Sequence, residues 1–257
     1  MIKLVYAIAR RAGMPPEAFR DHWLNVHGPK VSARAGAIGA LKYVQSHLLD
    51  HPANEGLRAP RDMRPPLDGI TEIWWDSLDA FNAAYATPEG AEADRVLAED
   101  EERFIDFSRS SVFMTQEHPI FDRRAGGMAG PDPVKITYLL AARPGMSRAD
   151  CHRIWRAEHA ALATSVAETL GLARYVQSHT IPGIDEHPVR RGVAMAPAFD
   201  GITEVWVDRL SDIEAWGETE ARLAAGAALA EDERRFVDLP RSHCFLAREH
   251  VIFDRAG

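Results

Sequence analysis

Trp23-Leu24-Asn25-Val26-His27 recurs in the chain as Trp155-Arg156-Ala157-Glu158-His159. Subtracting 27 from 159 gives an offset of 132 residues. With this offset, Lys3 to Arg123 aligns with Lys135 to Arg255 without a gap. The sequence therefore predicts one domain that occurs twice.

The predicted boundaries are 1–123 for the first domain and 134–257 for the second, joined by a Gly- and Pro-rich linker at 124–133. Each unit has roughly 125 residues, enough to bury its own core. A hydrophobic content of 46% and a charged content of 26% are typical of a globular protein. The net charge of -8, without any basic run, argues against nucleic acid as a partner.

No stretch of the sequence reaches the roughly 18 apolar residues of a membrane span, and the N-terminus lacks the apolar core of a signal peptide. We therefore expect a cytoplasmic protein without a membrane partner. The two cysteines, Cys151 and Cys244, replace Phe19 and Val112 of the other half. This exchange predicts buried thiols rather than a disulfide.

The same order of elements is predicted in both halves. In the first half, strands are expected at Lys3 to Arg10, Leu41 to Leu48, Asp68 to Trp74 and Ser111 to His118, helices after Pro15 and from Ser77 to Phe104, and a long irregular loop at His51 to Leu67. Strand, helix, strand, strand, helix, strand is the ferredoxin-like order. Helices on one face leave the other face of each four-stranded antiparallel sheet bare, so the two sheets are expected to pack face to face as an α+β pseudo-dimer within one chain.

Two helix positions four residues apart lie on one face, so Trp23 and His27 can point together, as can Trp155 and His159. An aromatic ring beside an imidazole suits a pocket with one titratable group. It equally suits an ordinary core helix that ends in a histidine bonded to a carbonyl. Gly28-Pro29 is expected to end or kink the first helix, whereas the second helix has no such stop.

The predicted strands repeat polar residues on defined faces. Tyr43, Gln45 and His47 alternate on one strand face, and Tyr175, Gln177 and His179 repeat them. Glu72 and Glu204 each stand between apolar neighbours on the third strand, where a carboxyl has a raised pKa unless it is paired. The acidic runs at 99–101 and 231–233 are interpreted as solvated helix faces.

Together these motifs resemble the EthD domain of the dimeric α+β barrel superfamily. The resemblance rests on Phe19, Trp23 and His27 at four-residue spacing, on the Tyr-x-Gln-x-His strand and on the Asp-Gly-x-x-Glu strand. It implies a fused pseudo-dimer with a pocket between helices and sheet in each half, and it gives the helix histidine's role to His27 and His159. It also implies a cofactor-independent enzyme that acts on phenolic substrates.

The leading hypothesis is a lyase of the decarboxylase, dehydratase or cyclase type that acts on a phenolic or polyketide-like aromatic substrate, without a cofactor or metal. His27 or His159 would transfer the proton, and Glu72 or Glu204 would orient the histidine or carry a second proton. The substrate would be held by residues of the same pockets: Trp23, Trp155, Tyr43, Tyr175, Gln45, Gln177, His47, His179, Tyr6 and Tyr138.

Three alternatives stay open. The first is a monooxygenase, either cofactor-free or dependent on a metal or heme; His27, His47 and Glu72 are the ligand types of non-heme iron. The second is an isomerase, and the third is a non-catalytic barrel that only binds a small molecule or merely dimerises. A further homodimer of the pseudo-dimer is left open as well. Because Ser111 becomes His243 and the first helix is more polar than the second, the two pockets are expected to differ, with the first half the more polar.

Overall fold

The computed structural model describes residues 1–124, 130, 132–184, 187–190 and 192–255. The strands are β1 (Ile2–Ile8), β2 (Lys42–Leu48), β3 (Gly69–Trp75), β4 (Ser111–Asp122), β5 (Val134–Leu140), β6 (Leu172–Ile181), β7 (Gly201–Val207) and β8 (His243–Asp254). The helices are α1 (Pro16–Asp21), η1 (His22–His27), α2 (Gly28–Arg34), α3 (Ala53–Arg58), α4 (Leu78–Tyr85), α5 (Pro88–Glu101), α6 (Arg148–Ile154), η5 (Trp155–His159), α7 (Ala160–Val166), α8 (Leu210–Glu214) and α9 (Glu220–Glu233). The ferredoxin-like order predicted for both halves is confirmed, while most of the predicted linker lies outside the described residues.

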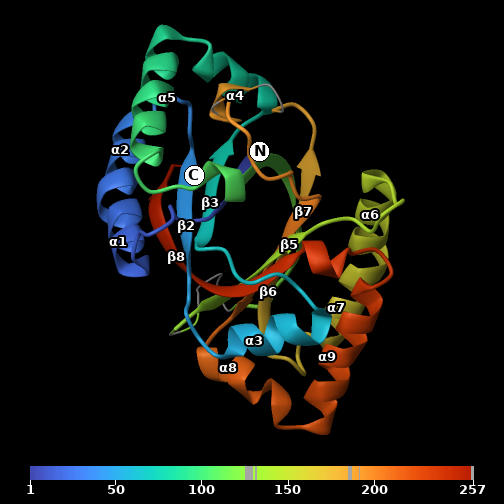
Figure 1. Cartoon of the computed structure of the whole chain (residues 1–257). Coiled ribbons are helices and arrows are strands. Elements are labelled where there is room, and N and C mark those ends of the chain that lie inside the picture. The colour runs from blue at the N-terminus through green and yellow to red at the C-terminus, as the bar shows by residue number, and fades with distance from the viewer. Residues whose placement is uncertain (125–129, 131, 185–186, 191, 256–257) are drawn as a thin grey trace.

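The strands form one closed antiparallel barrel in the order β1-β3-β2-β8-β5-β7-β6-β4 (Figure 1). Each half contributes four strands, and the halves join where β2 pairs with β8 and β4 pairs with β6. The predicted pseudo-dimer is therefore confirmed. The edge pairing completes it, because the 12-residue strands β4 and β8 extend beyond their own sheets and reach the other half.

Each strand has one face inside the barrel and one face under helices. Inside, one end is filled by an apolar cluster from both halves that includes Val5, Ile70, Phe113 and Phe245. Outside, α1, α2, α4 and α5 cover the first sheet, and α6 to α9 cover the second (Figure 1). Two further apolar clusters lie under these helices, one for each half.

Gly69 explains why the third strand begins with Asp-Gly. A Cβ atom at Gly69 would lie 2.6 Å from the Trp23 ring and 2.6 Å from the Ser46 carbonyl oxygen. Gly201 has the same relation to Trp155 and Ser178. The glycine therefore lets the helix tryptophan pack directly on the sheet.

Two local expectations need correction. The stretch His51 to Leu67 is not wholly irregular, because it contains α3, and α3 lies beside α8 and α9 of the other half (Figure 1). Leu57 of α3 belongs to the second half's apolar cluster, and burial of this side chain accounts for the order. The first helix does not end at Gly28-Pro29 but continues as α2, because proline is tolerated in the first turn after the π-helical stretch η1. Within the described residues, no helix has both the length and the apolar character needed to cross a membrane.

Candidate functional site

The Trp-Tyr-Gln-His residues form one hydrogen-bonded network in each half. In the first half, the Trp23 indole Nε1 donates to the Tyr43 hydroxyl at 3.3 Å, and Gln45 Nε2 donates to the same hydroxyl at 2.8 Å and to the Trp23 carbonyl at 2.9 Å. His47 Nε2 contacts Gln45 Oε1 at 2.9 Å, and its ring stacks on Trp23 with the centroids 4.3 Å apart. These polar groups are therefore satisfied by the protein itself.

The second half repeats this network with Trp155, Tyr175, Gln177 and His179. Burial, followed by the neighbouring His250, lowers the pKa of His47 to about 3. Burial, followed by His152, lowers the pKa of His179 to about 2. Both histidines are neutral at pH 7, and the network ties the helix to the sheet. Their predicted role in holding substrate stays a prediction.

Each helix histidine is bonded to an aspartate of the long second helix. His27 Nδ1 lies 3.0 Å from Asp100 Oδ2, and His159 Nδ1 lies 2.9 Å from Asp232 Oδ2. Both imidazoles are buried, and Nε2 of each has no hydrogen-bond partner among the described residues. An aspartate on Nδ1 fixes the tautomer in which Nε2 can accept a proton. The two pairs are therefore candidate acid/base centres.

The two pairs differ in their surroundings. Asp100 also contacts His22 at 3.2 Å and Lys30, whereas Asp232 contacts Arg235 at 2.6 Å. Burial alone would raise the pKa of Asp100, but the hydrogen bonds from His27 and Lys30 outweigh it and hold that pKa well below its usual range. The interpretation of the first acidic run as a solvated face is thus wrong for Asp100, which is buried in contact with His22, His27 and Lys30, and for Glu101. The same interpretation of the second run is wrong for the buried Glu233.

The predicted pairing of the strand glutamates with the helix histidines is also wrong. Glu72 is two residues from Ile70 on β3, so both side chains point into the barrel. His27, in contrast, is under the helices on the outer face of the sheet. The sheet therefore lies between them. The same separation rules out the grouping of His27, His47 and Glu72 as ligands of one metal ion.

Inside the barrel, Glu72 and Glu204 meet two buried lysines. Lys3 Nζ lies 3.0 Å from Glu72 and also contacts Glu204, and Lys135 Nζ lies 2.5 Å from Glu72 and 2.6 Å from Glu204. Glu117 is 3.0 Å from Lys3, and Glu249 is 3.1 Å from Lys135. This Lys-Glu cluster lies at the opposite end of the barrel interior from the apolar cluster.

The charges of the Lys-Glu cluster are coupled. Burial alone would lower the pKa of Lys3, but the carboxylates, first Glu204, outweigh it and raise that pKa. Burial and the neighbouring Glu204 raise the pKa of Glu72 to about 7, while Lys135 and Lys3 lower the pKa of Glu204 against its burial. Near neutral pH, Glu204 is therefore ionised while Glu72 is partly protonated.

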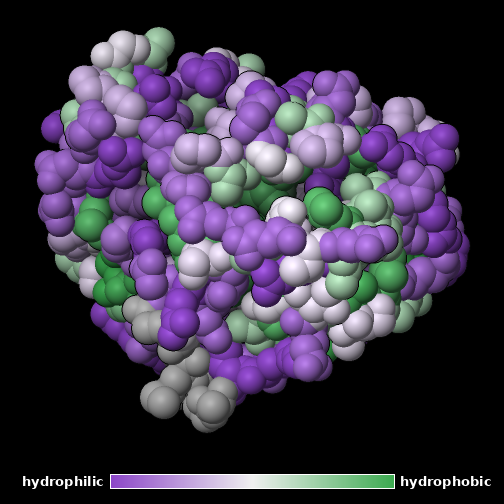
Figure 2. All heavy atoms as spheres, turned by 90° about the horizontal axis from the view of Figure 1, so that it is seen from below, coloured by the Kyte–Doolittle hydropathy of each residue, from purple (hydrophilic) through white to green (hydrophobic). Residues whose placement is uncertain are grey.

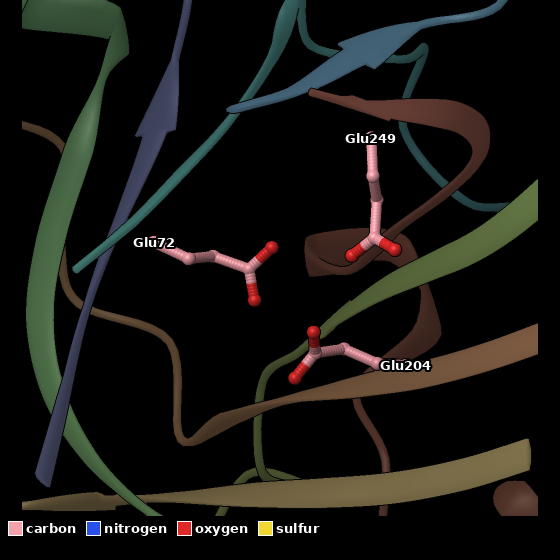
Figure 3. A group of neighbouring side chains, drawn as sticks. All are labelled: Glu72, Glu204 and Glu249. Atoms are coloured by element: carbon pink, nitrogen blue, oxygen red, sulfur yellow. The ribbon is translucent and has the colours of Figure 1, made fainter. Parts of the chain in front are cut away.

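Figure 3 shows Glu72, Glu204 and Glu249 reaching toward one another from β3, β7 and β8. Their oxygens lie within 4.8 Å of one another, the only such grouping of three metal-binding side chains among the described residues. The Lys3 and Lys135 ammonium groups already contact these oxygens. The cluster is thus an ion-pair core whose cations are lysines, and a divalent ion would have to displace them.

A cavity of about 750 Å³ lies between α3 of the first half and the α8–α9 region of the second half. It is called the second-half cavity here, because most of its lining residues belong to the second half. Its walls are mainly apolar and comprise Pro52, Ala53, Gly56, Leu57, Pro60, Leu170, Ile213, Trp216, Gly217, Leu223, Gly226, Ala227, Leu229 and Ala230. Its polar residues are His51, Arg61, Glu214 and Arg222. Figure 2, which views the molecule from below, shows apolar residues in small separate groups on a largely hydrophilic face rather than as one broad patch. The volume of the cavity and its apolar wall with a few polar residues are typical of small-molecule sites.

Charged groups lie at one side of this cavity, and a buried phenol, Tyr138, lies near Arg61 and Glu233 without being a lining residue. Arg61 Nε donates to Glu233 Oε2 at 2.6 Å, and Arg222 Nη1 donates to the Ala215 carbonyl at 3.1 Å. Tyr138 is buried, and its hydroxyl has no hydrogen-bond partner in the described part of the chain. Burial, followed by Glu233, raises the pKa of Tyr138 well above its usual value, so this phenol is a hydrogen-bond donor.

The first half fills the corresponding space with aromatic rings. Phe81 and Tyr85 stand where the second half has Ile213 and Gly217, and their ring centroids are 4.2 and 4.9 Å from that of His187. The two halves therefore differ in the residues around this space. That the first half has the more polar pocket stays a prediction.

The EthD domain matches the chain twice, at residues 11–108 and 143–240, and 143 minus 11 is again 132. The chain belongs to the EthD family. A solved structure described as an anthrone oxidase-like protein is 13% identical to this tandem EthD chain, with a TM-score of 0.61 over 100% of this chain and 95% of that one. A proposed chlorite dismutase is 11% identical, with a TM-score of 0.51 over 98% and 95%. These likenesses are of fold, and no curated protein matches the sequence.

Several residues of these EthD domains escaped the sequence analysis. Asp100 and Asp232 were hidden within acidic runs, although the runs recur at the same offset. Lys3 and Lys135 also recur, each as one charge in an apolar strand, and that pattern signals a buried ion pair. Arg61 has no counterpart, because the matching position is Val193, so the repeat gave no signal for it.

Proposed function

We propose that the protein is an enzyme that binds a flat aromatic molecule with an acidic oxygen in the second-half cavity and acts on it by proton transfer. The observation that carries this proposal is the cavity itself, with apolar walls and two arginines. Trp216 and the leucines would pack on the ring. Arg61 or Arg222 would bind a phenolate or carboxylate oxygen, since guanidinium groups match planar anions.

His159 with Asp232 is the proposed proton carrier. Ala230 is the last residue of α9 that lines the cavity, and Asp232 follows it by two residues, about half a helical turn. Neither Asp232 nor His159 is among the lining residues, so the proposed role requires a substrate that extends beyond Ala230 to His159 Nε2. The free Nε2 supports this role.

The proposed reaction type is a cofactor-independent lyase. In a decarboxylation of a phenolic acid, the bond between ring and carboxylate breaks and carbon dioxide leaves. His159 Nε2 first takes the proton of the phenol hydroxyl. The bonding electrons then enter the ring, His159 returns that proton to the ring carbon, and the product leaves as the phenolate. An oxidation by dioxygen is the second candidate, and the anthrone oxidase-like relative of the same tandem length supports it.

The proposal is tested first by ligand binding. We expect hydroxybenzoic acids to raise the melting temperature, and Gly226→Leu to abolish this shift, because a side chain at Gly226 enters open space at the cavity wall. The matched control is Ala228→Leu, on the exposed side of the same helix. A shift that survives Gly226→Leu, or that no phenolic acid produces in the parent protein, overturns the proposed site.

Turnover then tests the histidines. We expect His159→Ala to lower kcat by about 10²- to 10⁴-fold, the usual contribution of a general base. His27→Ala should leave kcat within a few-fold of the parent value, because the α8 and α9 residues that form most of the proposed cavity's wall belong to the half that contains His159. Equal losses in the two variants contradict the assignment. Product formation under strict exclusion of oxygen separates the lyase from the oxidase.

A further inference from the structure

We infer that a second cavity, at the apolar end of the barrel, binds a compact organic dianion with carboxylate or phosphate groups. This cavity measures about 380 Å³ and lies between the two halves. Its walls pair equivalent positions of the repeat: Arg109 with Arg241, Pro65 with Pro197, and Ser111 with His243. The cavity therefore lies where the two repeats meet in equivalent positions, and it is distinct from the cavity between α3 and α9.

The electrostatics of this dianion cavity point to an anion. Its walls carry Arg64, Arg109 and Arg241, and none of its described lining residues is acidic. The whole chain has a net charge of -8. A wall with three arginines and no carboxylate is therefore positive on an otherwise acidic protein. Arg109 has no carboxylate partner among the described residues, and Arg241 has Asp238 at 3.6 Å. Guanidinium groups bind carboxylates and phosphates with paired hydrogen bonds.

The cavity is held open by the two crossover segments. The Arg64 backbone N–H donates to the Ser242 carbonyl at 3.0 Å, and the Ala196 N–H donates to the Ser110 carbonyl at 2.9 Å. Each segment is thus fixed to the start of the other half's last strand. The floor is apolar, with Leu67 and Phe199, and suits a short hydrocarbon body between the anionic groups.

His243 makes one side of the cavity different from the other. Its Nδ1–H donates to the Pro65 carbonyl at 2.8 Å, as the Ser111 hydroxyl donates to the Pro197 carbonyl at 2.9 Å in the equivalent place. Burial lowers the pKa of His243 to about 4, so the ring is neutral at pH 7 and Nε2 can accept a hydrogen bond. The backbones of Arg64 and His243 form an isolated β-bridge, so the Arg64 charge and the His243 acceptor belong to the same side of the cavity.

Calorimetric titration with phthalate and with phenyl phosphate tests this inference, and inorganic phosphate is the reference for an ion without an apolar body. We expect phthalate, phenyl phosphate or both to bind more tightly than inorganic phosphate, and Arg64→Gln/Arg241→Gln to weaken the affinity at least tenfold. Both arginines are exposed, so the variant should fold, and its melting temperature checks this. Arg153→Gln, an exposed arginine on α6, is the matched control.

Equal affinity in the arginine variant and the control, or no binding of either organic dianion, overturns the inference. The titrations are run in the Gly226→Leu background, so that the proposed substrate cavity does not contribute. Conversely, protection by hydroxybenzoic acids should survive Arg64→Gln/Arg241→Gln. Failure of one site is thus distinguishable from failure of the other.

Discussion

At the scale of single residues, neutral buried histidines characterise this protein. The pKa values of His47, His179 and His243 are all lowered, mainly by burial. In the unfolded chain these groups bind protons near pH 6.5. Between the lowered pKa of the folded state and the pKa near 6.5 of the unfolded state, the unfolded chain holds more protons than the folded one. The stability contributed by these histidines is therefore full above pH 6.5 and falls as the pH decreases.

We expect the free energy of unfolding to fall by about 1.4 kcal/mol per pH unit for each such histidine below pH 6.5. The network histidines His47 and His179 supply two of these protons, so His47→Gln/His179→Gln should flatten the dependence between pH 6.5 and 4.5. Urea unfolding at a series of pH values measures the slope. A slope as steep in the variant as in the parent protein contradicts the assignment.

At the scale of elements, the periodic patterns were predictable, whereas contacts between residues distant in sequence were not. The alternation of Tyr43, Gln45 and His47 correctly placed them on one strand face, because that pattern is local. The burial of Asp100 depends on Lys30 and His27, which are distant in sequence. Likewise, the Gly- and Pro-rich composition of the stretch that contains α3 suggested a loop. The helix is ordered by its packing on the other half, which the local composition does not show.

The α4 and α8 regions differ in a way that predicts binding stoichiometry. Phe81→Ile/Tyr85→Gly gives these two positions the residues Ile213 and Gly217 of the second half and should open a first-half cavity. The cost should reach at most about 3–5 kcal/mol for the buried Phe81 and be smaller for the half-buried Tyr85. Calorimetric titration with a hydroxybenzoic acid should then report two sites per chain instead of one. Tyr85→Phe keeps the space filled and should still give one site. A single site in the double variant would show that the rings do not block the first half.

At the scale of the whole molecule, the Lys-Glu cluster joins the two halves through their charges. Lys3 of the first half contacts Glu204 of the second, and Lys135 of the second contacts Glu72 of the first. Sequence alone marked the glutamates as needing a partner, but only closure of the barrel brings both lysines to them. The apolar end and the charged end of the barrel thus both depend on the presence of two repeats.

Replacement of Lys3 by Met therefore tests how far the halves depend on each other. We expect Lys3→Met to lower the free energy of unfolding by about 3–5 kcal/mol, since it leaves buried carboxylates short of a cation. The loss should be smaller at pH 5 than at pH 8, because a carboxyl whose pKa is raised is neutral at the lower pH. Lys42→Met, at a half-exposed ion pair with Asp254, is the control and should cost less than about 1 kcal/mol.

A double-mutant cycle with Glu204→Gln completes this test. Because Glu204→Gln removes a charge that Lys3 neutralises, Lys3→Met/Glu204→Gln should cost less than the sum of the single variants, by about 1–3 kcal/mol. Urea unfolding of the four proteins measures this coupling across the two halves. Strict additivity would mean that the lysine and the glutamate act independently, and the barrel would then be held together by its strand pairing and apolar cluster alone.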